Sequence, residues 1–152
     1  MTNYCHTFIS QSVEETLEFG RRIASGLKAG DVLALAGDLG AGKTHLCKGI
    51  AEGLEADPDR VNSPTFVLLQ QYAGRLPIFH FDTYRLGDVS EFEDLGGLEI
   101  LEQGGVSLVE WPRKIQELLP ARTVWIEIEA TAPESRRFRF RTNPRAVALG
   151  FV

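Results

Sequence analysis

The sequence predicts an α/β fold, a three-layer domain of the P-loop NTPase type whose mixed sheet has a parallel core. Apolar runs of strand length alternate with stretches of helical periodicity, as expected where helices join buried strands. A hairpin pattern in the middle of the chain and two alternating runs near its end predict an antiparallel part. A glycine-rich stretch between the first apolar run and a helix has the pattern of a P-loop.

Length and composition fit one folded domain spanning residues 1–152. Hydrophobic residues make up 43% of the chain and charged residues 24%, which is typical of a globular protein and excludes a disordered one. The formal net charge of -5 argues against a free-standing nucleic-acid binder, so no DNA partner is expected. No signal-peptide pattern and no apolar run of membrane-spanning length are present, which predicts a cytoplasmic protein with no membrane partner.

The two cysteines, Cys5 and Cys47, carry no recognisable motif. They do not form a CxxC pair, and they have no ligand-like spacing to the three histidines. This pattern predicts two reduced thiols.

The first helix is expected over residues 12–28. Apolar and small residues recur there at spacings of four and three, which places them on one face: Val13, Leu17, Gly20, Ala24 and Leu27. Ser12 followed by Glu15 matches a capping box. Gly30 stands where a C-terminal glycine cap belongs.

A buried strand over residues 31–36, a P-loop and a second helix over residues 44–54 follow in that order. The loop sequence GDLGAGKT matches G-x-x-x-x-G-K-[ST], in the strand-to-helix context that this pattern requires. Its backbone amides would form an anion nest at the positive end of the helix, while Lys43 would reach the terminal phosphates and the Thr44 hydroxyl would bind Mg²⁺. The expected phosphate-binding residues are Gly37, Asp38, Leu39, Gly40, Ala41, Gly42, Lys43 and Thr44.

The middle of the chain predicts a β-hairpin followed by an acidic segment. Residues 65–72 and 76–84 are strand-like runs joined by turn residues 73–75. Residues 88–105 are expected to be helical or irregular, because two glycines interrupt them.

The last part predicts a buried strand over residues 105–111, a short helix opened by a proline over residues 112–119, and two alternating strands over residues 122–131 and 136–143. In the final strand, alternation predicts buried phenylalanines and solvated arginines, namely Phe138, Phe140, Arg137, Arg139 and Arg141. A basic strip for RNA or an acidic partner is the alternative, and we favour the first interpretation.

Two acids, Asp82 and Glu110, each end an apolar strand, as the Walker-B carboxylate of a P-loop protein does. Solvent begins at strand ends, so one such acid alone is weak evidence; beside a P-loop, a functional role for at least one is expected. Spacing does not decide which of the two touches the metal.

Two further residues are candidates for the site. Pro64 biases the preceding residue to an extended form, so Thr65 would be displayed as a phosphate- and Mg²⁺-sensing switch threonine. Trp111 follows Glu110 directly and is either a packing residue or an interface anchor. The guanine-reading sequence N-K-x-D is absent, which leaves ATP as the expected nucleotide.

Four motifs, GDLGAGKT, SPTF, HFDTYRL and VEWP, occur in an order and a chain length that resemble the bacterial TsaE (YjeE) family. The resemblance begins at SVEETLEFGRRIA and covers most of the chain. It implies a small P-loop fold and the ATPase component of tRNA threonylcarbamoyladenosine biosynthesis, with weak turnover of its own. It also implies partners, the other proteins of the threonylcarbamoyl-transfer complex, with tRNA contacted only indirectly and hydrolysis resetting the complex between cycles.

Carried over by position, the resemblance implies that the loop from Gly37 to Thr44 holds phosphates and that Thr44 and Glu110 bind Mg²⁺. Thr65 resembles the switch threonine, Asp82 an acid needed for hydrolysis, and Trp111 a residue on the nucleotide or partner side. Arg85 matches the family arginine with no role assigned, and His45 replaces the second threonine usual after GKT.

Two alternatives remain open: a small-molecule P-loop kinase, and a nucleotide-gated binding module that does not hydrolyse. A kinase would need an arginine-bearing lid, and no segment between the strands has that pattern. The segment near Ser12 is the expected place for one side of the adenine site.

Overall fold

The computed structural model describes residues 3–38, 40–61 and 68–149, so Leu39 and Thr65 lie outside the described residues. The helices and strands come in an order that confirms the α/β prediction. They are β1 (Tyr4–Ser10), α1 (Val13–Ser25), β2 (Val32–Ala36), α2 (Lys43–Gly53), η1 (Pro58–Arg60), β3 (Leu69–Tyr72), β4 (Ile78–Asp82), α3 (Val89–Asp94), α4 (Gly97–Leu101), β5 (Val106–Glu110), η2 (Pro112–Leu118), β6 (Val124–Ala130), β7 (Arg136–Arg141) and α5 (Pro144–Leu149).

The strands form one seven-stranded mixed sheet in the order β1-β7-β6-β2-β5-β4-β3. The central four strands are parallel, since β2 pairs with both β5 and β6, and β4 pairs with β5. The β3–β4 hairpin and the β6–β7 and β1–β7 pairs are antiparallel. The predicted parallel core with antiparallel flanks is therefore confirmed.

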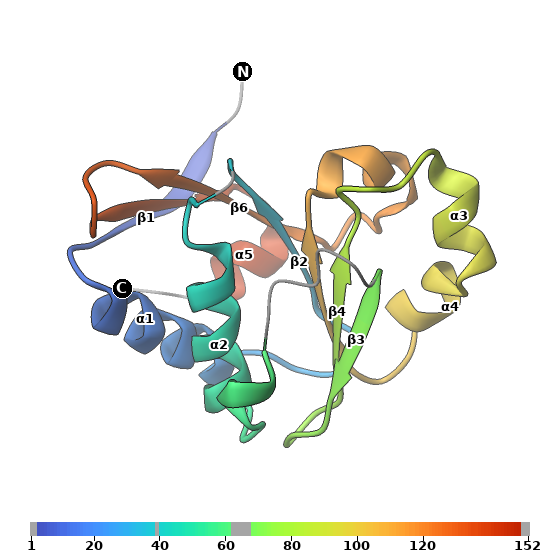
Figure 1. The fold of residues 1–152 in the computed structure, drawn as a ribbon, viewed down its shortest axis with the longest axis horizontal. Coiled ribbons are helices and arrows are strands. Elements are labelled where there is room, and N and C mark those ends of the chain that lie inside the picture. Colours follow the sequence, from blue (N-terminus) through green and yellow to red (C-terminus); the bar gives the residue numbers. More distant parts are fainter. Residues whose placement is uncertain (1–2, 39, 62–67, 150–152) are drawn as a thin grey trace.

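Helices cover both faces of the sheet, which gives the three predicted layers. Figure 1 shows α1 and α2 on one side and α3 and α4 on the other. Alternation along each strand divides the core in two, because neighbouring side chains point to opposite faces. Leu33 and Leu35 pack under α1 and α2, whereas Val32 packs with α3 and η2. No helix in the described part of the chain is long and apolar enough to span a membrane.

Two elements at the ends of the chain were not predicted. Strand β1 pairs with β7, and its Phe8 ring stacks on Phe19 with centroids 4.1 Å apart. Helix α5 is held by Arg145, whose guanidinium binds Asp31 at the start of β2 with an N–O distance of 2.6 Å. Both elements depend on long-range contacts, which local periodicity does not register.

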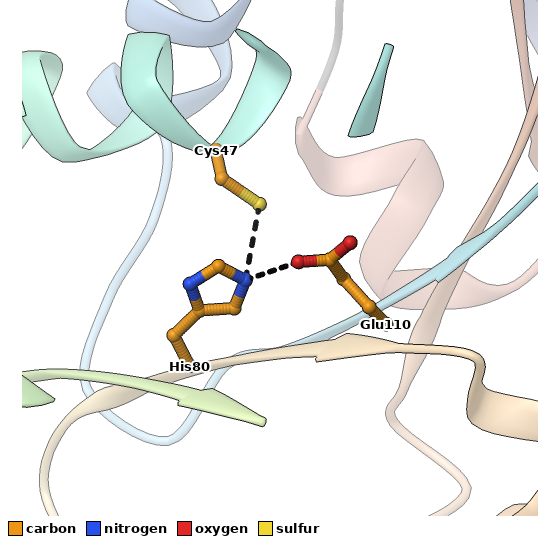
Figure 2. A group of neighbouring side chains, drawn as sticks. All are labelled: Cys47, His80 and Glu110. Carbon is orange, nitrogen blue, oxygen red and sulfur yellow. Dashed lines mark hydrogen bonds and ion pairs between the residues drawn. The ribbon is translucent and has the colours of Figure 1, made fainter. Parts of the chain in front are cut away.

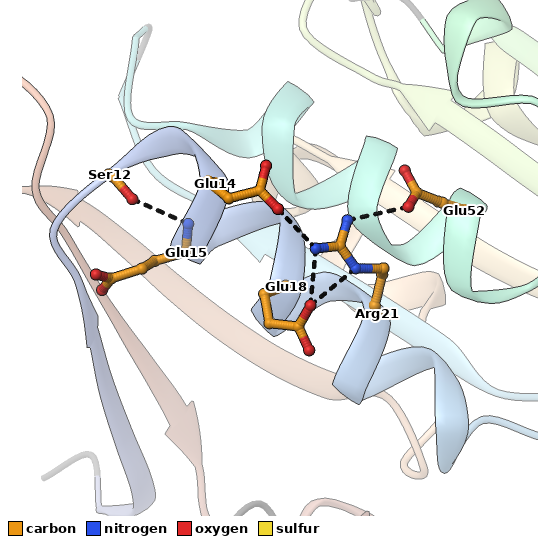
Figure 3. Close-up of polar contacts among 6 residues, drawn as sticks. All are labelled: Ser12, Glu14, Glu15, Glu18, Arg21 and Glu52. Atoms are coloured by element: carbon orange, nitrogen blue, oxygen red, sulfur yellow. Dashed lines mark hydrogen bonds and ion pairs between the residues drawn. The ribbon is translucent and has the colours of Figure 1, made fainter.

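Helix α1 begins as predicted and ends earlier. The Ser12 hydroxyl accepts the Glu15 N–H at 3.1 Å (Figure 3), but the helix closes at Gly26 rather than at Gly30. Gly20, Ala24 and Leu27 are buried as predicted, whereas Val13 is 43% exposed. The residues that face the core are Thr16, Phe19, Gly20, Ile23 and Ala24.

Helix α1 packs closely against α2. Gly20 and Gly49 face each other, and a Cβ at Gly49 would lie 2.4 Å from the Leu17 carbonyl oxygen. Only glycine permits backbones to approach this closely. At the solvent side of the same interface, Arg21 on α1 binds Glu52 on α2 at 3.0 Å, and also the two acids Glu14 and Glu18 (Figure 3).

The sheet register places three strand ends together. Leu35 on β2 and Asp82 on β4 both pair with Glu110 on β5. The loop after β2 therefore lies at the same edge as the two predicted acids, at the carboxyl ends of parallel strands where α/β proteins build their sites.

Candidate active site

The loop between β2 and α2 has the backbone of a phosphate nest. Gly40 has φ of +77° and Gly42 has φ of +106°, a region that favours glycine. Gly42 is the N-cap of α2, and no side chain caps its first amides. Gly37 is required for a different reason, because a Cβ there would lie 2.6 Å from the Ile128 carbonyl oxygen. The loop thus presents uncapped N–H groups at the positive end of a helix.

Lys43 is buried at the mouth of this loop, with 6% of its surface exposed. Its ammonium donates to the Gly37 carbonyl at 2.5 Å and to the Asp38 carbonyl at 3.4 Å. It also lies 3.8 Å from the centre of the Trp111 ring. Burial lowers the pKa of Lys43, and the nearby acids Glu110 and Asp82 oppose that shift.

Trp111 has an unusual backbone. Its φ of 58° is one of two positive values at non-glycine residues in the described chain. Thr83 holds this turn, since its hydroxyl lies 3.1 Å from the Glu110 carbonyl oxygen and 2.5 Å from the Trp111 carbonyl oxygen, between which its hydrogen is shared. The Tyr84 ring lies 4.8 Å from that of Trp111. Strain of this kind is retained where the surrounding structure fixes it, often at functional sites.

The two predicted acids are adjacent but differ in their partners. Asp82 accepts the Tyr84 N–H at 2.9 Å, and its burial raises the pKa of its carboxyl group. Glu110 is 2% exposed and places Oε2 at 2.6 Å from Nε2 of His80. Of the two acids, Glu110 is therefore anchored by a side chain and Asp82 by a backbone N–H.

His80 is the centre of a buried polar cluster that the sequence did not reveal. Figure 2 shows its Nε2 between Glu110 and Cys47, whose sulfur lies 3.7 Å away. On the other side of the ring, Nδ1 lies 3.0 Å from the Tyr72 hydroxyl, which donates to Gln70 Oε1 at 2.5 Å. Burial raises the pKa of the Cys47 thiol well above its ordinary value. One sequence pattern could have indicated this position of His80. The alternation in IFHFD places the histidine on the opposite face of the strand from its phenylalanine neighbours.

A cavity of about 350 Å³ brings the predicted residues together. Lys43, Thr44, Asp82, Glu110 and Trp111 all line it. The remaining lining residues are Gly40, Ala41, Gly42, His45, Tyr84 and Arg136. A larger cavity of about 530 Å³ lies on the other side of Trp111 and touches the loop only at Gly37 and Asp38.

Arg136, at the start of β7, is a second residue that sequence reasoning missed. Its side chain lies against Gly42 and donates to the Gly40 carbonyl at 3.3 Å. It also donates to carbonyls of the preceding turn, and its Nε is buried with no hydrogen bond to a described residue. Among the described residues it has no carboxylate partner, so its charge is available to an anion in the cavity.

The other arginines of β7 support the interpretation favoured from the sequence, a strand with buried phenylalanines and solvated arginines. Phe138 and Phe140 are fully buried. Arg137 binds Glu129 at 2.9 Å, Arg141 binds Glu127 at 3.3 Å, and Arg139 lies over the Tyr4 ring. Glutamates on β6 therefore neutralise most of this strip.

Comparison with known proteins assigns the chain. The family model described as threonylcarbamoyl adenosine biosynthesis protein TsaE matches residues 10–138. The chain belongs to the TsaE family. A relative from Bacillus subtilis (strain 168), named tRNA threonylcarbamoyladenosine biosynthesis protein TsaE, is 46% identical over 128 residues, which are 84% of this chain and 79% of the relative. A TsaE relative of the same name from Treponema pallidum (strain Nichols) is 38% identical over 128 residues, 84% of this chain and 94% of its own.

A solved structure confirms the TsaE fold. The crystal structure of Bacillus subtilis YdiB superposes with a TM-score of 0.76 and 34% sequence identity. The match covers 98% of this chain and 93% of YdiB.

Proposed function

We propose that this TsaE-family chain is a Mg²⁺-dependent ATPase that serves the biosynthesis of N6-threonylcarbamoyladenosine in tRNA. The observation that carries the proposal is the meeting of a P-loop with two buried acids, Asp82 and Glu110, around one cavity. The names of the relatives support the pathway, since they are called tRNA threonylcarbamoyladenosine biosynthesis proteins.

The charge arrangement fits a polyphosphate. The amides at the start of α2, the Lys43 ammonium and the Arg136 guanidinium all border the cavity. Lys43 is now bound to neutral carbonyls, and phosphate oxygens would replace them with anionic acceptors. Ala41 and Gly42 supply backbone without a side chain large enough to fill the nest.

The same cavity has hard oxygen donors suited to Mg²⁺. The Thr44 hydroxyl and the Glu110 carboxylate would hold the ion, because Mg²⁺ prefers one or two protein oxygens together with phosphate and water. When bound, Mg²⁺ supplies positive charge against the phosphates. Asp82 would orient the attacking water, and Thr65 is proposed as the switch threonine. The roles of Leu39 and the adenine-side segment near Ser12 stay predictions.

The resting geometry supports weak turnover without partners. The Lys43 ammonium is covered by Trp111 and held by its own loop, so nucleotide binding would have to break both contacts before the charge could stabilise the transferring phosphoryl group. We propose that other proteins of the threonylcarbamoyl-transfer complex bind this cytoplasmic chain and raise its turnover, with tRNA reached only through them.

Two measurements test the proposal. Calorimetric titration with ATP and Mg²⁺ should give a single site, and Lys43→Ala should lower the affinity about tenfold or more, since charged hydrogen bonds contribute about 1.5–3 kcal/mol. Unchanged affinity in Lys43→Ala would exclude the P-loop assignment. Phosphate release to water should rise when the transfer proteins are added; transfer to a small acceptor would indicate a kinase, and no release under any condition a binding module.

A further inference from the structure

The buried cluster of Cys47, His80 and Glu110 has the composition of a zinc site (Figure 2). Its three donor atoms, a sulfur, an imidazole nitrogen and a carboxylate oxygen, all lie within 4.8 Å of one another. They come from α2, β4 and β5, so packing of the helix on the sheet brings them together. Zn²⁺ accepts this mixture of ligands, whereas Mg²⁺ does not take thiolate.

The contacts of His80 suit a metal ligand. Nδ1 lies 3.0 Å from the Tyr72 hydroxyl, and Nε2 faces the Glu110 carboxylate oxygen at 2.6 Å. In the tautomer with its proton on Nδ1, that N–H donates to Tyr72 and leaves the Nε2 lone pair free to bind a cation. The hydrogen bond at Nδ1 is also the outer contact that fixes metal-binding histidines in structures.

The sulfur–nitrogen pair already has the separation that an ion needs, whereas the carboxylate must move. Tetrahedral zinc with ordinary bond lengths separates its sulfur and nitrogen ligands by about 3.6 Å, and Cys47 and His80 are 3.7 Å apart. The nitrogen–oxygen separation must open from 2.6 Å to about 3.3 Å. Glu110 lines the 350 Å³ cavity, which gives its carboxylate room to move.

We propose that Cys47, His80 and Glu110 bind Zn²⁺, or a cation of the same class, and that this ion withdraws Glu110 from the proposed Mg²⁺ site. The metal site stands on the cluster alone, whereas its inhibitory effect rests on the proposed ATPase function. One carboxylate serves both ions, so occupation of the zinc site should weaken Mg²⁺-dependent nucleotide binding.

Cobalt tests the metal site without nucleotide. Co²⁺ titrated into the full chain should bind in a 1:1 ratio and give tetrahedral visible absorption with a near-ultraviolet thiolate-to-cobalt band, both displaced by Zn²⁺. Cys47→Ser should lose the thiolate band and at least about tenfold in affinity. Cys5→Ser is the matched control, since Cys5 lies on β1 and contacts the β7 carbonyls instead.

The thiolate band persisting in Cys47→Ser, or absent from the unmodified chain, would overturn the site. X-ray absorption of the zinc-loaded unmodified chain gives a check that needs no variant: one sulfur ligand supports the site, and a shell of nitrogen and oxygen alone contradicts it.

The inhibitory effect has its own readout. Zn²⁺ at saturating level should lower Mg²⁺-dependent ATP affinity in Cys5→Ser and have a much smaller effect in Cys47→Ser. An equal loss of ATP affinity in both variants would overturn the proposed inhibition. The cobalt spectrum would still decide whether the metal site exists. No ATP binding in any variant would instead overturn the proposed function, and the inhibitory effect with it.

Discussion

The Lys43 ammonium lies 3.8 Å from the centre of the Trp111 ring while donating to the Gly37 carbonyl. One side chain thus links the phosphate loop to the turn that follows β5. Phosphate binding would have to draw Lys43 from both contacts, so occupancy of the loop is coupled to the surroundings of Trp111.

This coupling predicts a fluorescence signal. In a Trp125→Phe background, where Trp111 is the remaining tryptophan, ATP with Mg²⁺ should change the emission, because a cation leaves the indole face. Combining this background with Lys43→Ala should abolish the change even at ATP concentrations that saturate the loop. An identical change without Lys43 would show that the ring responds to something else.

The two acids should differ in their response to Mg²⁺. Glu110→Gln is expected to reduce the Mg²⁺-dependent part of ATP affinity about tenfold, as loss of a metal ligand does. Asp82→Asn should have a smaller effect than Glu110→Gln on the Mg²⁺-dependent part of ATP affinity, because the Asp82 carboxylate already accepts the Tyr84 N–H. It should have a larger effect than Glu110→Gln on the rate of phosphate release. Calorimetry with and without Mg²⁺ measures the first effect, and the reverse order would exchange the two roles.

Arg136 should contribute to nucleotide affinity. Arg136→Met is expected to weaken ATP binding about tenfold, because it removes a guanidinium that borders the cavity and lacks a carboxylate partner among the described residues. Arg137→Met is the matched control, since this neighbour is neutralised by Glu129. Equal losses in both variants would indicate a general effect of charge on the strand.

Asp82 should cost stability at neutral pH. Burial raises its pKa above the ordinary value of 3.8, so the folded chain holds this proton more tightly than the unfolded chain. Stability therefore falls as pH rises from below 3.8 through the raised pKa. Asp82→Asn keeps an acceptor for the Tyr84 N–H and should be more stable than the unmodified chain at pH 7, with the difference vanishing in acid. Urea unfolding at several pH values measures this; a gain that persists below pH 3.8 would refute the cause given.

The interface between α1 and α2 should not tolerate a methyl group. Gly49→Ala is expected to destabilise the fold by about 1–3 kcal/mol, because the new Cβ would meet the Leu17 carbonyl oxygen at 2.4 Å. This exceeds the gain of about 1 kcal/mol that alanine brings to a helix. Gly104→Ala, which meets no described atom within 4 Å, should stay within about 0.5 kcal/mol of the unmodified chain in the same unfolding experiment.

Local patterns in the sequence predicted much of the fold. The glycine spacing located the loop, the alternation in RRFRFR separated buried Phe138 from solvated Arg137, and the Ser12 cap marked the start of α1. The predicted face of α1 was right at Gly20, Ala24 and Leu27 and wrong at Val13, and its end was wrong, because packing against other elements decides both. Strand β1 and helix α5 were missed for the same reason, since each is stabilised by residues far away in the chain.

The sequence by itself determined the phosphate loop and the acids at the strand ends, because backbone conformation and strand alternation follow from neighbouring residues. Only the tertiary structure decided what joins them. Cys47 and His80 have no meaningful spacing along the chain, yet packing of α2 on β4 sets them 3.7 Å apart beside Glu110. Arg136 likewise reaches the loop only because β7 returns along β6. Contacts between distant segments depend on the packing of whole layers, and no local pattern records them.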